Sequence, residues 1–254
     1  MIYEALHRIV EEGGRAVVLT IVSGPGAGGK LLVREDGSTV GDGPADLGEL
    51  APEALRRGRS QIFEHGEATV FADVFAPPAR LLIIGAIDTA EALCRAAKLL
   101  GWTSIVADAR AVFATRERLP SADEIIVAWP EEALEQVKPD VGTAVVVLTH
   151  DDKFDLPALS GALATDAFYI GALGSRRNQE RRKERLLEAG VAESDFERIA
   201  GPCGLDVGAE SPAETALSIL AEILAVRAAR PGGKLKDAKT RIHVEQPEQA
   251  VSGT

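Results

Sequence analysis

The chain has 254 residues with a hydrophobic fraction of 46%, enough to fill the core of one large domain or two smaller ones. Its formal net charge of −11 argues against nucleic acid or an anionic membrane as the main partner. Two cysteines are too few for a disulfide framework, and no apolar stretch approaches the roughly 20 residues that span a bilayer, so we expect a cytoplasmic protein.

The first part of the chain predicts a small α+β unit. Apolar residues recur at helical spacing over residues 2–10, and strand-like sequence follows at 15–41 and 60–75. The segment Ala-Pro-Pro-Ala-Arg at 76–80 interrupts this pattern. We therefore expect a first domain over residues 1–77.

Beyond that boundary, continuous apolar runs alternate with amphipathic segments. This alternation predicts an α/β fold in which helices cover a doubly wound parallel sheet, a Rossmann-like domain over residues 78–230. Residues 231–254 show weak periodicity and predict a mobile tail. The runs that predict strands lie at 80–86, 103–109, 124–130, 143–151 and 166–174.

The start of the last helix is strongly marked. Ser211 as N-cap and Glu214 three residues later form a capping box, with proline at the first helical position. Leu217, Leu220 and Leu224 predict an apolar stripe that packs on the sheet.

The glycines and polar residues of this domain that could form a binding site gather where the predicted strands end. In an open parallel sheet, ligands bind beyond the carboxyl ends of the strands, so we expect these residues to share one rim. Those that follow or end a predicted strand are Gly85, Asp108, His150, Asp151, Gly171, Gly174, Ser175, Arg176 and Arg177.

The turn after the first of these strands partly matches a dinucleotide-binding fingerprint. Gly85 stands at the first glycine position, while Ile87 and Ala90 replace the second and third glycines. Asp108, about 20 residues further on, suits the acidic group that receives a ribose hydroxyl. The alternative is a nucleotide pocket that is altered or unused.

The segment Tyr-Ile-Gly-Ala-Leu-Gly-Ser-Arg-Arg at 169–177 predicts an anion site. Gly171 and Gly174 permit a tight turn, Ser175 can cap the next helix, and the N–H groups of its first turn favour anions. Arg176 and Arg177 oppose the helix dipole unless an anion is present, and guanidinium groups suit phosphate.

A salt-bridged surface helix is the competing interpretation of the same arginine-rich segment. It accounts for the rear half of the helix, where ion pairs add a few tenths of a kcal/mol each, and it leaves the two leading arginines unexplained. The residues involved are Arg181 and Arg185 with Glu180, Glu184 and Glu188.

Three further residues could carry chemistry. His150 and Asp151 follow a buried strand and could act as acid, base, metal ligand or polar anchor, with a structural hydrogen bond as an equal alternative. Cys203, placed next to a glycine, is expected to be exposed near a ligand, without a base that would make it a nucleophile. No metal-ligand set is predicted.

Several motifs, taken in order, resemble the XdhC/CoxI family of xanthine dehydrogenase accessory proteins. They are "LLIIGAIDTAEAL", "ADAR", "VVVLTHD", "YIGALGSRR" and "GLDVGAESPAETALSILAEILA", which cover most of residues 80–230. The resemblance implies that the chain binds molybdenum cofactor, protects it and delivers it to an apo molybdenum hydroxylase of the xanthine or carbon monoxide dehydrogenase type. A cysteine desulfurase and a second copy of the chain are the further partners that it implies.

The chain departs from the family pattern at two places. Where the first domain of the family often has "GGC", residues 41–45 read Gly-Asp-Gly-Pro-Ala, which argues against a thiolate contact to molybdenum from this domain. Where the first Rossmann turn usually reads "GAGHV", residues 85–89 read Gly-Ala-Ile-Asp-Thr. We expect a non-catalytic chaperone; an NAD(P)-dependent oxidoreductase with His150 as proton donor, and a regulator that binds only protein, are the alternatives.

Overall fold

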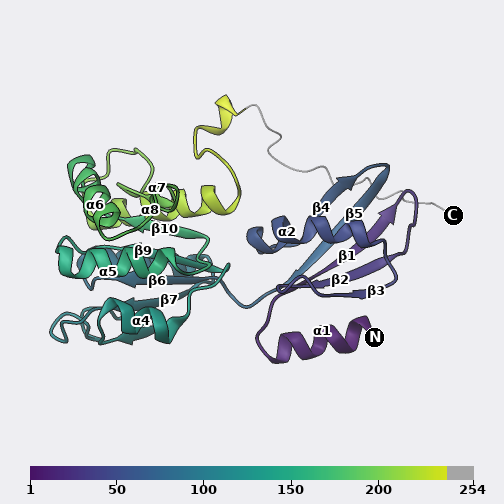
Figure 1. The fold of residues 1–254 in the computed structure, drawn as a ribbon, viewed down its shortest axis with the longest axis horizontal. Helices are drawn as coiled ribbons and strands as arrows, with labels where there is room; N and C mark the ends of the chain where they lie inside the picture. Colours follow the sequence, from purple (N-terminus) through teal and green to yellow (C-terminus); the bar gives the residue numbers. More distant parts are fainter. Residues whose placement is uncertain (239–254) are drawn as a thin grey trace. The chain divides into compact units, whose positions relative to one another are not determined.

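The computed structural model describes residues 1–238, and the chain divides into two compact units, Met1–Pro77 and Pro78–Gly232 (Figure 1). Each unit has its own sheet and its own hydrophobic clusters. Of the expected tail, Leu235–Asp237 forms a short 3-10 helix, η2, and residues 239–254 lie outside the described residues.

The first unit contains a five-stranded antiparallel sheet in the order β3-β2-β1-β5-β4. Alternate side chains of the central strand face opposite sides, so that Val17 and Leu19 pack in one cluster and Ala16 and Val18 in another. The strands are β1 (Ala16–Ser23), β2 (Lys30–Arg34), β3 (Thr39–Gly41), β4 (Gln61–His65) and β5 (Ala68–Phe75).

Helices cover both faces of this sheet (Figure 1). Helix α1 (Ile2–Glu11) packs through Ile9 on one face, as its helical spacing predicts. The 3-10 helix η1 (Ala45–Leu50) and helix α2 (Ala51–Arg57) pack on the other face and were not predicted from the sequence.

The second unit is built on a six-stranded sheet in the order β11-β10-β9-β6-β7-β8, with every pair of neighbouring strands parallel. This confirms the predicted Rossmann-like α/β fold. The short edge strand β11 was not predicted. The strands are β6 (Arg80–Ile84), β7 (Thr103–Ala107), β8 (Glu124–Ile126), β9 (Thr143–Val147), β10 (Tyr169–Ala172) and β11 (Ile199–Ala200).

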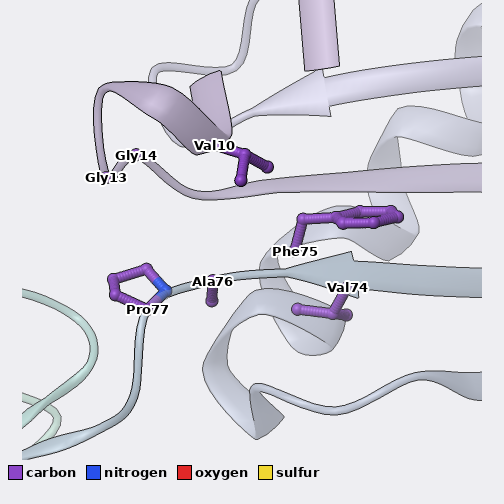
Figure 2. Close-up of a pocket in the computed structure, with 7 residues that line it drawn as sticks. All are labelled: Val10, Gly13, Gly14, Val74, Phe75, Ala76 and Pro77. Carbon is purple, nitrogen blue, oxygen red and sulfur yellow. The ribbon is translucent and has the colours of Figure 1, made fainter. Parts of the chain in front are cut away.

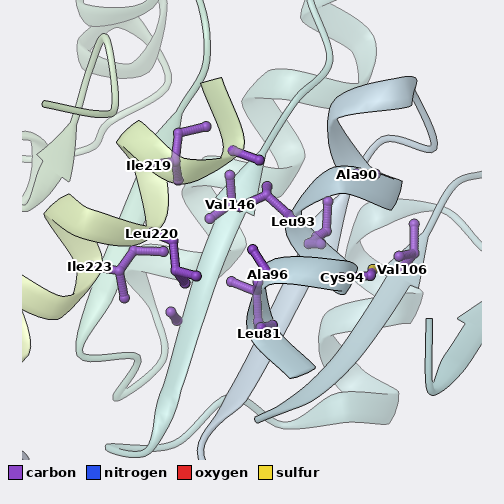
Figure 3. Packing of buried hydrophobic residues seen from close by; sticks show 14 of the residues in the cluster. Leu81, Ala90, Leu93, Cys94, Ala96, Val106, Val146, Ile219, Leu220 and Ile223 are labelled. Carbon is purple, nitrogen blue, oxygen red and sulfur yellow. The ribbon is translucent and has the colours of Figure 1, made fainter. Parts of the chain in front are cut away.

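Two hydrophobic clusters lie on opposite faces of this sheet. Leu81 and Ile83 point toward the cluster with α3 (Asp88–Leu99) and α8 (Pro212–Arg227), which Figure 3 shows from close by. Leu82 and Ile84 point toward the cluster that includes residues of α4, α5 and α6. The remaining helices are α4 (Pro130–Val137), α5 (Asp152–Leu163), α6 (Arg176–Glu188) and α7 (Glu193–Phe196).

Helix α8 begins as predicted but packs through another face. The Ser211 hydroxyl accepts from the Glu214 N–H at 3.2 Å, and the Glu214 carboxylate accepts from the Ser211 N–H, which confirms the capping box. Leu217 and Leu224 are exposed, so the expected leucine stripe was wrong. The buried face consists of Ala216, Ser218, Ile219, Leu220 and Ile223.

Candidate functional site

The candidate site is the rim formed by the carboxyl ends of β6, β7, β9 and β10. Strands β6 and β9 are neighbours in the sheet, but β6 leads to α3 on one face and β9 leads to α5 on the other. Such a reversal of connection is where ligands bind in open α/β sheets. The rim therefore has the geometry expected of a binding site.

The crevice between β6 and β9 is closed by direct packing. Gly85 has a φ of +114°, and a Cβ there would lie 2.9 Å from Cγ2 of Thr149. The cavity beside these two residues is about 10 Å³, about the space of one water molecule. Ile87, at the second glycine position of the fingerprint, is half-buried against the α3 side of the core. This cavity is too small to hold a pyrophosphate group.

Asp108 is held in place by hydrogen bonds to both of its oxygens. Arg110 donates from Nε to Oδ1 at 2.9 Å and from Nη2 to Oδ2 at 2.8 Å, and the Ala86 N–H donates to Oδ2 at 2.9 Å. Burial alone would raise the pKa of Asp108, but these hydrogen bonds outweigh it and lower the pKa below its ordinary value. A ribose hydroxyl would have to compete with these donors for the carboxylate.

Aromatic rings surround the Arg110 guanidinium on this part of the rim. Its Cζ lies 4.5 Å from the ring centre of Phe113 and 5.4 Å from that of Phe154. Trp129, which is half exposed, packs against Phe154 with ring centres 5.1 Å apart. The sequence carries no signal for Trp129, which follows a strand as an apolar residue between Ala128 and Pro130.

His150 and Asp151 are both exposed where β9 leads into α5. Asp151 is the N-cap of α5: its carboxylate accepts from the Lys153 N–H at 3.2 Å. Among residues 1–238, no group of three or more histidine, cysteine, aspartate or glutamate side chains is placed to hold a metal ion. Asp151 therefore makes a structural hydrogen bond, which was the alternative to a chemical role for this residue.

The turn before α6 is built differently from the expectation. Gly171 lies inside β10, where a Cβ would meet the Tyr169 side chain at 2.6 Å, so it serves packing and not the turn. Gly174 has a φ of +148°, and Ser175 caps α6 by accepting from the Asn178 N–H at 3.2 Å. Arg176 is the first residue of the helix.

The arginines of α6 have different environments. Arg176 and Arg177 are exposed, and the first turn of α6 contains no acidic residue. Arg181 pairs with Asp152 of α5 at 2.9 Å, and not with a glutamate of its own helix as the surface-helix interpretation requires. Arg182 is buried. Arg181 and Arg182 thus connect α6 to α5, whereas Arg176 and Arg177 remain exposed at the rim.

Arg182 forms a buried network that the sequence did not reveal. Its Nε and Nη2 donate to Oδ2 of Asp155 at 3.0 and 2.7 Å, and Nη2 also donates to the carbonyl of Leu173 at 2.8 Å. Thr149 donates its hydroxyl to the other oxygen of Asp155. The signal that could have identified Arg182 is the spacing to the buried Leu186, four residues later on the same helix face.

Cys203 is buried, which contradicts the expected exposure. Its N–H donates to the carbonyl of Ala172, and its side chain belongs to the cluster on the α8 side of the sheet. Burial raises the pKa of the thiol to about 12. Nearby, the Tyr169 hydroxyl donates to Glu222 at 2.5 Å, and the Gly204 N–H donates to the same oxygen at 2.8 Å. Cys203 is therefore a core residue.

A separate pocket of about 280 Å³ lies in the first unit, between the end of α1 and the end of β5 (Figure 2). It contains none of the candidate residues, and its lining has no titratable or nucleophilic side chain. This pocket offers no chemistry for catalysis. The lining residues are Val10, Gly13, Gly14, Val74, Phe75, Ala76 and Pro77.

Comparison with known proteins gives consistent results. The sequence model described as the XdhC Rossmann domain matches residues 81–223. A molybdenum cofactor insertion chaperone of Escherichia coli, PaoD, is 33% identical over 60% of this chain, and a Bacillus subtilis protein described as a probable subunit of xanthine dehydrogenase is 34% identical over 62%. An uncharacterized Escherichia coli protein, YqeB, is 32% identical over 90% of this chain.

The match covers less than half of these relatives: 42% of PaoD, 46% of the Bacillus subtilis protein and 44% of YqeB. A crystal structure described as a xanthine dehydrogenase from Bacillus halodurans superposes with a TM-score of 0.63 and 26% identity, over 89% of this chain and 66% of that one. No helix among residues 1–238 is both long and apolar enough to cross a membrane. By its sequence and its second unit, the chain belongs to the XdhC family.

Proposed function

We propose that the chain is an accessory protein that binds molybdenum cofactor by its phosphate or pyrophosphate end and delivers it to an apo molybdenum hydroxylase in the cytoplasm. The relatives that carry a functional name support an accessory role in this chemistry, one as an insertion chaperone and one as part of a xanthine dehydrogenase. These relatives name neither a cysteine desulfurase nor a second copy of the chain, and the proposal requires neither.

The observation that carries the proposal is the start of α6. Every other α-helix among residues 1–238 has an aspartate or glutamate in its first turn, which suits the positive end of the helix dipole. Helix α6 has Arg176 and Arg177 there instead. Two cations at this end are unfavourable unless an anion lies against them, and guanidinium groups bind phosphate in a bidentate manner.

The exposed groups of the chain suit the phosphate end of the cofactor better than its metal, because no accessible cysteine is available as a ligand. Cys94 and Cys203 are both buried, and burial raises the pKa of their thiols to about 11 and about 12. Neither offers an accessible thiolate to molybdenum. The chain thus holds its cargo through phosphate contacts, and the closed crevice at Gly85 argues against an NAD(P)-dependent oxidoreductase.

The proposal is tested by titrating the purified protein with molybdenum cofactor. We expect micromolar binding by the wild type and a loss of at least about tenfold in an Arg176→Ala, Arg177→Ala double variant, because two charge-assisted contacts are removed. An Arg181→Ala, Arg185→Ala variant, with the same change in charge further along α6, serves as the control. NADPH is the comparison ligand.

The outcomes separate the candidate functions. Equal losses in the two double variants would show that net charge, and not the start of α6, determines binding. Saturable NADPH binding without cofactor binding would favour the oxidoreductase. Delivery is measured by adding the loaded protein to an apo xanthine dehydrogenase, where activation faster than that by free cofactor is the expected result.

A further inference from the structure

An exposed indole and an exposed guanidinium lie against the same buried ring where β7 and β8 end. Arg110 follows β7, and Trp129 follows β8, the neighbouring strand of the sheet. Both contact the buried Phe154: Cζ of Arg110 is 5.4 Å from its ring centre, and the ring centre of Trp129 is 5.1 Å from it. The phosphate contacts proposed above use neither residue.

Trp129 presents one face of its indole ring to solvent. The ring packs on Phe154 with an angle of 35° between the two planes, and 47% of the residue is exposed. Nε1 of the indole donates to no group in the described part of the chain. Because this face lies at the edge of the sheet where ligands bind in open α/β folds, a flat ligand can stack on it.

Arg110 is held in a fixed orientation with one donor left over. Nε and Nη2 donate to the Asp108 carboxylate at 2.9 and 2.8 Å, which leaves Nη1 without a hydrogen-bond partner among residues 1–238. The ring of Phe113 supports the guanidinium at 4.5 Å, and the side chain is 41% exposed. A guanidinium that is already ordered loses little conformational freedom when a ligand binds, so Nη1 is a pre-organised donor.

The two groups together favour a planar heterocycle. An indole face attracts a flat aromatic ring, and the Arg110 donor suits an oxygen or nitrogen acceptor at the edge of that ring. An aliphatic group makes no use of the donor, and a phosphate makes no use of the indole face. The cavity beneath Phe154 is about 10 Å³, so the ring lies on the exposed surface and does not enter the protein.

We propose that Trp129 and Arg110 form a stacking platform for a planar heterocyclic ring. The ring stacks on the open face of Trp129, and an acceptor at its edge takes a hydrogen bond from Nη1 of Arg110. The inference deepens the proposed function and rests on it where the ring belongs to molybdenum cofactor, as its pterin or as the base of a dinucleotide form. It assigns ring recognition to the end of the rim formed by β7 and β8.

The first test follows the two indole N–H signals by NMR while neopterin, cytidine or guanosine is added to the protein. We expect a saturable shift of the Trp129 signal, whereas Trp102, which is 7% exposed, serves as the internal control. Binding of such small rings is weak, in the millimolar range. A shift with neopterin alone identifies the pterin as the ligand, and a shift with a nucleoside alone identifies the base. No shift of the Trp129 signal with any of the three probes would overturn the platform.

Variants at the platform separate stacking from a structural role. Stacking predicts that Trp129→Ala weakens binding of the ring at least about fivefold, while Trp129→Phe, which keeps an aromatic face, retains most of it. Arg110→Lys keeps the charge but removes the fixed donor, and it should weaken binding about two- to tenfold. Tyr3→Ala, which removes an exposed ring of the first unit, should have no effect. A lower urea midpoint in Trp129→Ala with unchanged ring binding would overturn the proposal.

Titration of the same variants with molybdenum cofactor separates the platform from the function. Cofactor binding that is unchanged in Trp129→Ala would refute the platform and leave the proposed function standing. Binding of free rings that depends on Trp129, with no cofactor binding by the wild type, would support the platform and refute the proposed function.

Discussion

Two aspartates of α5 provide a matched test of the packing between α5 and α6. Asp155 pairs with the buried Arg182, and Asp152, three residues earlier, pairs with the exposed Arg181. Each is replaced by alanine, so the chemical change and the helix are the same. The two variants differ in the environment of the ion pair and in the hydrogen bond from the Thr149 hydroxyl, which only Asp155→Ala removes.

The expected magnitudes follow from the exposure of each pair. Asp155 and Arg182 are 1% and 2% exposed, and Asp155→Ala leaves a buried guanidinium without its carboxylate, which typically costs about 3 to 5 kcal/mol. Asp152 and Arg181 are 32% and 50% exposed, and a pair in that environment contributes about 1 kcal/mol or less. We therefore expect a severalfold larger loss of stability for Asp155→Ala.

Urea unfolding followed by tryptophan fluorescence measures both losses. The two tryptophans, Trp102 and Trp129, lie in the second unit, so the signal reports the unit that contains both ion pairs. The slope of the free energy against urea must stay unchanged for the midpoints to be compared. Equal midpoints for the two variants, or a loss below about 1 kcal/mol for Asp155→Ala, would refute the reasoning.

Three further predictions concern other residues of the second unit. Gly171→Ala places a methyl group 2.6 Å from the buried Tyr169 ring, which should lower the urea midpoint by an amount equivalent to about 1 to 3 kcal/mol; an unchanged midpoint would contradict the packing. Cys203, whose pKa burial raises to about 12, should react with a disulfide reagent at pH 8 much more slowly in the native protein than in urea. The pKa of Asp108 is lowered in the folded state. Its contribution to stability is therefore fully present above its pKa in the unfolded chain, about 4, and is lost as the pH falls through its pKa in the folded protein. Asp108→Asn should therefore reduce the urea midpoint more at pH 7 than at pH 3.

The alternation of apolar strands and amphipathic helices by itself determined the parallel α/β fold of the second unit. Strands buried on both faces read as continuous apolar runs, and this signal is local. The helix caps were also readable, because Ser175 and Ser211 bond to N–H groups only three residues away. The grouping of polar residues at strand ends followed from the same alternation.

Only the tertiary structure decided which side chains of these elements are buried. Arg181 and Arg182 are neighbours of identical chemistry, yet only Arg182 faces Asp155, which is 27 residues away in the chain. In α8, apolar residues occupy most positions, so periodicity could not select Ile219 and Ile223 over the exposed Leu217. Burial depends on which face of each helix meets the sheet and its neighbouring helices, and contacts between distant segments determine that choice.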